Sequence, residues 1–267
     1  ASVGQFVRGR LNRRWLNQFG VAALASAAAC LVYLMLADLL TNTGLHTIHG
    51  PGYVASLLFL VPGFPMITSI LDMVRMDFTA GLSRAAYSFG LILAATMSAW
   101  MFSAATGLQP LPAQTVFPYP WAWFAYAVAT ACGVAGFAIL FNSSPCTVAW
   151  AAALGACGNL CRLALVGVNL PAQLAAGVGG IVIGFLASPL SVRTKLPRIT
   201  LTVPACVIMV PGASMYRTVY WLNGQDMTKA LTFGVDAVLT VILIACGLVV
   251  ARMCTDPAWA RNLPVPS

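Results

Sequence analysis

The chain has 267 residues, of which 60% are apolar and only 7% are charged, and its mean hydropathy is +0.87. A water-soluble domain carries charge on about a quarter of its residues, so this composition excludes an ordinary soluble globule. It also argues against nucleic-acid binding, because the net charge of +8 is concentrated in short clusters beside apolar runs. The composition predicts an all-α integral membrane protein.

A helix needs about 20 apolar residues to cross the hydrocarbon core of a bilayer, and eight stretches meet that length. They are residues 19–40, 52–71, 83–106, 120–141, 145–164, 170–189, 199–217 and 230–252. Glycines in the sixth stretch, at positions 177, 180 and 184, predict close helix packing. Cys157 and Cys161 are four residues apart but no His or carboxylate follows nearby, so we expect no metal site, and nothing indicates a cofactor.

The positions of Lys and Arg predict the orientation, because cytoplasmic loops are enriched in them. If the cluster from Arg8 to Arg14 is cytoplasmic, eight crossings also place the basic residues near 75–84, 193–198 and 252–261 inside. The loops at 41–50 and 109–119 contain no Lys or Arg and are expected outside. Both termini are therefore expected in the cytoplasm. Three basic residues break the rule and are interpreted first as helix-end side chains: Arg162, Arg217 and Lys229.

The run Val61–Met66 recurs as Val210–Met215, and the match continues at a constant offset of 149 residues, with seven of 22 positions identical. The two copies lie on the second and seventh predicted spans, an odd number of crossings apart. They should therefore run in opposite directions, which is the inverted-repeat architecture of many secondary transporters.

The second repeat, residues 108–267, holds five predicted spans, whereas the first, residues 1–107, holds three. Two further spans are expected before residue 1 if the repeat is complete. The sequence thus predicts a five-plus-five bundle of ten helices, of which this chain is a piece.

Each copy contains a Pro-Gly pair, Pro62-Gly63 and Pro211-Gly212, and Pro65 follows the first pair. Proline removes a backbone donor and clashes with the preceding turn, so each pair should break its span. In lipid, freed backbone groups are tolerated only against protein or a water-filled cavity, which makes paired breaks a candidate substrate site with a polar lining. The alternative is that these residues only improve helix packing.

The segments around these pairs resemble the threonine/serine exporter family over most of the chain, from about Gly9 to Arg252. Those similar to the two halves of the family pattern are Phe59–Pro65, Asp72–Asp77, Ala80–Arg84, Val203–Pro204 and Met209–Arg217. Family members have ten transmembrane helices behind a hydrophilic N-terminal region, or consist of two subunits with one half each. This chain departs from both layouts, having only the last three spans of the first half.

The resemblance implies export of threonine and serine by proton antiport across the bacterial cytoplasmic (inner) membrane. The implied partners are a small amino acid, protons and the lipid bilayer, with either an upstream part of the same protein or a partner half-subunit. A homo-oligomer is an open possibility.

Proton coupling needs an ionisable group inside the membrane, and Asp236 lies six residues into an unbroken apolar run. An ionised carboxylate there is costly unless it is paired or protonated, so Asp236 is the first candidate, with helix-helix hydrogen bonding as the alternative. Asp77 and Asp226 are equivalent in the repeat, and each suits either a helix N-cap or a proton-coupling role.

Asp72, Arg75 and Arg84 are candidates for a cytoplasmic gate, in which Asp72 and Arg75 could pair if their helix continues; a surface ion pair is the alternative. Tyr216, Arg217 and Asn223 form a polar cluster after the second break. Arg217 could bind a substrate carboxylate, or the cluster could be an interfacial anchor.

An enzyme is disfavoured, because the chain has no Glu, no His-Glu-x-x-His string and no Gly-x-Gly-Asp string. The remaining alternatives to amino-acid export are a membrane scaffold or assembly subunit that does not transport, and a transporter of another small polar solute.

Overall fold

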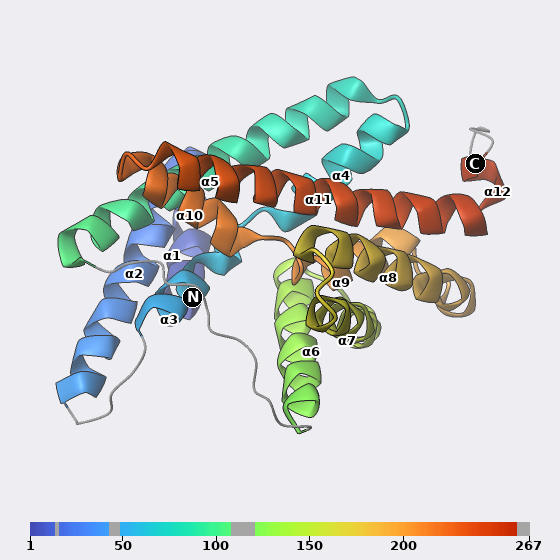
Figure 1. The fold of residues 1–267 in the computed structure, drawn as a ribbon, viewed down its shortest axis with the longest axis horizontal. Coiled ribbons are helices and arrows are strands. Elements are labelled where there is room, and N and C mark those ends of the chain that lie inside the picture. Colours follow the sequence, from blue (N-terminus) through green and yellow to red (C-terminus); the bar gives the residue numbers. More distant parts are fainter. Residues whose placement is uncertain (14–15, 43–48, 108–120, 261–267) are drawn as a thin grey trace. The chain divides into compact units, whose positions relative to one another are not determined.

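The computed structural model describes residues 1–13, 16–42, 49–107 and 121–260, and every regular element within those ranges is a helix (Figure 1). In chain order the elements are α1 (Ser2–Asn12), α2 (Gln18–Asn42), α3 (His49–Leu57), the short 3-10 helix η1 (Leu58–Leu60), α4 (Gly63–Val74), α5 (Phe78–Thr106), α6 (Ala122–Leu140), α7 (Pro145–Gly167), α8 (Ala172–Thr194), α9 (Arg198–Val207), α10 (Gly212–Asn223), α11 (Met227–Thr255) and α12 (Pro257–Ala260). Most of the two expected outer loops, and also Arg14 and Arg261, fall outside the described residues.

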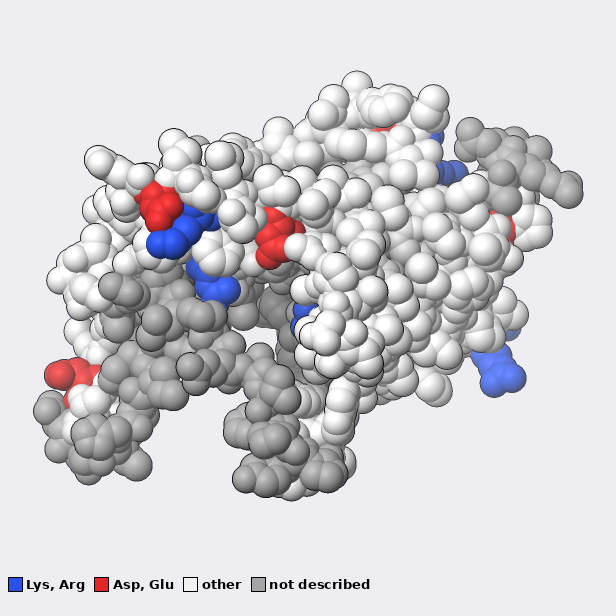
Figure 2. All heavy atoms as spheres, viewed as in Figure 1, with Lys and Arg blue, Asp and Glu red and all other residues white. Residues whose placement is uncertain are grey.

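Within the described ranges, α2, α5, α6, α7, α8 and α11 are long and apolar enough to cross a membrane, and the two interrupted pairs bring the six spans to as many as eight. The prediction of an all-α membrane protein is confirmed. Uncharged residues dominate the face drawn in Figure 2. Large apolar side chains such as Phe124 and Phe89 are 75% and 64% exposed, which in a membrane protein is the surface that lipid covers.

Local sequence signals explain several helix ends. The hydroxyl of Ser144 accepts a hydrogen bond from the backbone N–H of Thr147 at 3.3 Å, and Pro145 occupies the first turn of α7, where its missing donor costs nothing. Helix α8 ends at Thr194, and the next residue, Lys195, has a left-handed φ of 56°. Pro197 then immediately precedes α9.

Sequence reasoning missed α1, because its short, arginine-containing stretch lacks the length of a span. Gly4 is buried in it, and a Cβ at that position would lie 2.6 Å from Cζ of Phe59 and 2.8 Å from the carbonyl oxygen of Ala25. The absence of a side chain at Gly4 therefore permits close packing of α1 on α2 and the residues before the first break.

The sequence repeat is also a repeat of helix boundaries. Helices α4 and α10 each have 12 residues, and α5 and α11 each have 29, so both pairs keep the offset of 149 at both ends. The turns between them match as well, because Met76 and Gln225 have left-handed φ values of 65° and 60°. The antiparallel relation of the two copies stays a prediction, as does the division at residues 107 and 108.

The chain folds as two compact units. The first consists of residues 1–62, 86–115 and 211–237, so it combines helices of the first repeat with the α10–α11 turn of the second. Its core is formed by two apolar clusters, one around Cys30, Tyr53 and Tyr216 and the other around Leu60 and Leu91.

The second unit consists of residues 63–85, 116–210 and 238–267, and it combines the α4–α5 turn of the first repeat with α6 to α9 and the end of α11. One large apolar cluster forms its core. The predicted glycine packing is confirmed there: a Cβ on Gly177 or Gly180 would lie 3.2 Å or 2.7 Å from a backbone oxygen of α11. These glycines let the backbones of α8 and α11 approach closely.

Candidate functional site

The two Pro-Gly pairs interrupt their spans in the same way. Before the first break the N–H of Val61 donates to Leu58 at 3.2 Å, and before the second the N–H of Val210 donates to Val207 at 3.1 Å. Each of these bonds closes a tight turn, and a new helix begins at the glycine, Gly63 in α4 or Gly212 in α10. Both spans therefore break where the sequence predicted.

Each of these glycines contacts the residues that precede the other break. In the first unit, a Cβ on Gly212 would lie 2.8 Å from side-chain carbons of Leu58 and Val61. In the second unit, a Cβ on Gly63 would lie 3.1 Å from Val207 and 3.4 Å from Val210. The absence of a side chain at these glycines therefore permits close packing, more tightly at Gly212 than at Gly63.

A pocket opens beside Gly212 in the first unit. Its lining comes from the residues before the first break, from α5 and from the first turns of α10: Val54, Leu57, Leu58, Leu60, Val61, Ile92, Ala95, Thr96, Gly212, Met215 and Tyr216. This lining is apolar except for the hydroxyls of Thr96 and Tyr216. The sequence predicts a polar cavity at the breaks, whereas the pocket that the structure describes at Gly212 is largely apolar.

Asp236 lies on α11 opposite the first turn of α10. The hydroxyl of Ser214 donates a hydrogen bond of 3.4 Å to its carboxylate, and the side chain is half-buried. One turn further along α10, the guanidinium of Arg217 lies 5.5 Å from the ring centroid of Phe233 on α11. The α10–α11 turn of the first unit therefore carries an acidic and a basic side chain on facing helices.

Tyr216 is buried in the first unit between two other aromatic rings, Tyr53 and Tyr220, at centroid distances of 6.1 Å and 6.4 Å. Tyr53 in turn donates a hydrogen bond of 2.6 Å to the carbonyl of Ala99. Asn223 lies at the end of α10 and donates to the carbonyl of Val219 at 2.8 Å. Of the predicted polar cluster, Tyr216 is thus a core residue, whereas Asn223 ends a helix.

Asp77 and Asp226 both act as helix N-caps. Asp77 accepts hydrogen bonds from the N–H of Ala80 and the hydroxyl of Thr79, both at 3.2 Å, and Asp226 accepts from the N–H of Lys229 at 3.1 Å. Asp226 also pairs with the ammonium group of Lys229 at 2.8 Å. These contacts lower the pKa of Asp226 below its ordinary value, chiefly through the hydrogen bonds from Lys229.

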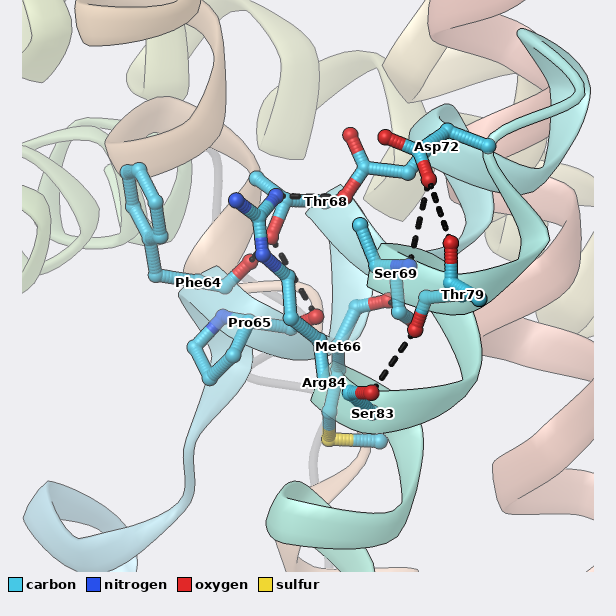
Figure 3. Close-up of polar contacts among 11 residues, drawn as sticks. Phe64, Pro65, Met66, Thr68, Ser69, Asp72, Thr79, Ser83 and Arg84 are labelled. Atoms are coloured by element: carbon cyan, nitrogen blue, oxygen red, sulfur yellow. Dashed lines mark hydrogen bonds and ion pairs between the residues drawn. The ribbon is translucent and has the colours of Figure 1, made fainter.

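Asp72 pairs with Arg84, at 2.5 Å, and not with Arg75 (Figure 3). Helix α4 ends at Val74, and Arg75 is the first residue after it. The guanidinium of Arg75 lies instead over the ring of Trp259, 5.8 Å from its centroid. The ion pair therefore links α4 to α5, and the structure does not bring Asp72 and Arg75 together as a pair.

Two polar groupings of the second unit were not predicted as sites. Asn159 donates to the hydroxyl of Thr130 at 2.9 Å and accepts from Nε of Arg162 at 3.0 Å, which joins α6 to α7. The only sequence signal was that Arg162 broke the charge rule. From the sequence, Arg198 was used only to predict the orientation of the chain in the membrane. In the structure its guanidinium donates hydrogen bonds to the carbonyl of Gly184 and the hydroxyl of Thr255.

The helices and their two breaks define a multi-pass membrane protein with two interrupted spans. Two family models match the chain: one described as "Threonine/Serine exporter, ThrE" matches residues 126–254, and one described as "Putative threonine/serine exporter" matches residues 1–106. The chain belongs to the threonine/serine exporter family.

The chain is also 37% identical over 82 residues to a protein of Haemophilus influenzae (strain ATCC 51907 / DSM 11121 / KW20 / Rd) that is described as uncharacterized. The match covers 31% of this chain and 28% of that relative, so the chain spans less than a third of the relative's length. No solved structure matches the chain.

Proposed function

We propose that this protein exports threonine and serine from a bacterial cytoplasm in exchange for protons, with both of its termini on the cytoplasmic side of the inner membrane. Family membership supports the substrate class. The observation that carries the mechanism is the contact of Asp236 with Ser214, which puts an ionisable carboxylate beside the first turn of a helix that begins inside a broken span.

The α10–α11 turn supplies the two charges that an amino-acid zwitterion requires. Asp236 can accept a substrate ammonium group or a proton but not both at once, which is the basis of exchange between them. Arg217, held against Phe233, can bind the substrate carboxylate. The backbone N–H groups at the start of α10, around Gly212, add a positive potential that favours the same carboxylate.

In this scheme Asp77 and Asp226 hold the starts of α5 and α11, and the pair of Asp72 with Arg84 joins α4 to α5 at the expected cytoplasmic side. The breaks contribute to the scheme because they leave backbone groups without helical hydrogen-bond partners. The residues of the scheme at the breaks are Pro62, Gly63, Pro65 and Pro211. In this scheme the charged side chains bind the substrate and the proton, and the broken helices expose backbone groups to the substrate.

The test is efflux from proteoliposomes that contain the full-length protein and are loaded with radiolabelled serine. An inward proton gradient should accelerate efflux of serine and threonine but not of lysine, and a protonophore should abolish the acceleration. Asp236→Asn should lose the acceleration while exchange of labelled for unlabelled serine continues, because asparagine keeps the shape but cannot titrate.

Asp38→Asn is the matched control, since Asp38 is an exposed carboxylate on α2. It should behave as the wild type. Proton-driven efflux that survives in Asp236→Asn would remove Asp236 from the mechanism and leave Asp77 and Asp226 as candidates. Failure to move either amino acid in the wild type would favour the scaffold alternative, and efflux of a different solute would change the substrate.

A further inference from the structure

A second pocket lies in the second unit, where the start of α9 meets the end of α11. Seven residues line it: Leu71, Gly184, Arg198, Ile199, Thr202, Leu248 and Arg252. Arg198 is the first residue of α9, and Arg252 is in the last turn of α11. The two arginines of the pocket are therefore at the ends of membrane-spanning helices, where lipid head groups are expected.

The basic side chains of this pocket are held in place. Arg198 donates to the carbonyl of Gly184 at 3.1 Å and to the hydroxyl of Thr255 at 2.8 Å. Arg252 lies over the ring of Trp259, 4.8 Å from its centroid, and Arg75 lies over the same ring. Three guanidinium groups from three parts of the chain thus lie near one another, and hydrogen bonds or a ring contact orient each of them.

The positive charge of this cluster exceeds its negative charge. The charged groups that act on Arg252 are Arg198, Arg75 and one carboxylate, Asp256, whose oxygen is 3.8 Å from Nε of Arg252. Among the described residues, no hydrogen bond reaches that buried Nε. Within the described part of the chain, one acid therefore faces three bases, and the excess favours an anion over an amino-acid zwitterion, whose net charge is zero.

Apart from Thr202, the remaining lining of the pocket is apolar, and exposed apolar side chains lie on the same helices. Leu71 and Leu248 lie inside it, and Ile199 is 37% exposed at its edge. Val250 and Met253, in the last turns of α11, are also exposed. A ligand that fits this surface has an anionic head and an apolar tail.

We propose that the pocket formed by Arg198, Arg252 and the nearby Arg75 binds the phosphate head group of an anionic phospholipid, with the acyl chains against Ile199 and the exposed side of α11. Guanidinium groups bind phosphate through paired, charge-assisted hydrogen bonds. Basic pockets between transmembrane helices on the cytoplasmic side are suited to such head groups. The charge-based orientation puts this pocket on that side, next to the cytoplasmic leaflet. The pocket shares no residue with the proposed transport site, and the proposal does not depend on the transport reaction.

The experiment measures lipid binding to the full-length protein in detergent by native mass spectrometry, with short-chain phosphatidylglycerol and phosphatidylcholine as probes. Phosphatidylglycerol should bind more tightly. Arg252→Gln should weaken its binding about fivefold, because each basic residue near a head group contributes about 1 kcal/mol. Arg75→Gln should act in the same direction, and since Arg75 is exposed its replacement spares the packing.

Arg193→Gln is the matched control, because Arg193 is an exposed arginine in the last turn of the adjacent helix α8 and does not line the pocket. It should leave binding unchanged. An equal loss in Arg193→Gln would overturn the proposal in favour of diffuse surface charge. Displacement of the lipid by an equal concentration of inorganic phosphate would mean a free-anion site, and displacement by serine would mean a part of the transport pathway. If Arg252→Gln lowers the thermal midpoint without lipid, Arg75→Gln decides the question.

Discussion

Asp77 and Asp226 are 149 residues apart and cap the first turns of two helices that each have 29 residues. The N–H of each aspartate also donates to a carbonyl five residues earlier, at 3.0 Å to Asp72 and at 3.1 Å to Trp221. The same turn is therefore built twice from different neighbours. Both copies keep an aspartate at this position although most of the surrounding residues differ. The aspartate caps a helix in each copy.

We expect Asp77→Ala to lower the free energy of unfolding by about 1 kcal/mol, because the backbone N–H of Ala80 loses its acceptor. Asp77→Asn should be close to the wild type, since asparagine caps helices as well as aspartate does. The thermal midpoint in detergent, followed by circular dichroism, measures both. If Asp77→Asn instead keeps its stability but loses proton-driven efflux, the capping role alone is insufficient and Asp77 takes part in coupling.

The stability contributed by Asp226 should depend on pH. Its pKa is lowered from an ordinary value of 3.8 by the bonds from Lys229, so its contribution is complete above that value and is lost as the pH falls through the lower, folded-state pKa. The thermal midpoint of the wild type should therefore exceed that of Asp226→Asn by a constant margin near neutral pH. The margin should shrink only below about pH 4. A margin that changes between neutral pH and about pH 5 would assign the titration to another group.

Much of the fold was predictable because its signals are local. Apolar length identifies the spans, and the repeated Pro-Gly pairs at Pro62 and Pro211 identify the two interrupted ones from the amino-acid sequence alone. Capping by Asp77 and Asp226 follows from residue type and position, which is why the sequence offers that alternative. These features depend on a few consecutive residues, so packing elsewhere does not alter them.

The partners of the arginines were not predictable in the same way. Arg75 follows the end of α4 at Val74, and nothing in the residue spacing reveals that its guanidinium will lie over the ring of Trp259. Arg198 finds Gly184 and Thr255 only because α8, α9 and α11 pack together. Spans that are apolar on all sides do not specify their neighbours by periodicity, so such contacts appear only in the folded chain.

The pair of Asp72 and Arg84 allows a direct comparison of the observed pairing with the one that the spacing suggests. Both side chains are partly exposed, at 25% and 48%, so a double-mutant cycle of Asp72→Asn with Arg84→Gln should give a coupling energy of about 0.5 kcal/mol that falls with salt. The matched cycle of Asp72→Asn with Arg75→Gln should give a coupling near zero. Stronger coupling to Arg75 than to Arg84 would contradict the observed end of α4.

Gly247 gives the sharpest test of the close approach of α8 and α11 in the second unit. A Cβ at Gly247 would overlap the carbonyl oxygen of Gly177 and lie 3.0 Å from the backbone nitrogen of Ile181, and backbone atoms cannot rotate away as a flexible side chain does. We expect Gly247→Ala to destabilise the protein by about 1–3 kcal/mol, the range for overpacking. The control is Gly136→Ala on α6, where a Cβ meets nothing within 4 Å and alanine should be neutral or should stabilise the helix. Thermal midpoints in detergent compare the two variants, and equal midpoints for them would mean that α8 and α11 do not approach as closely as the structure places them.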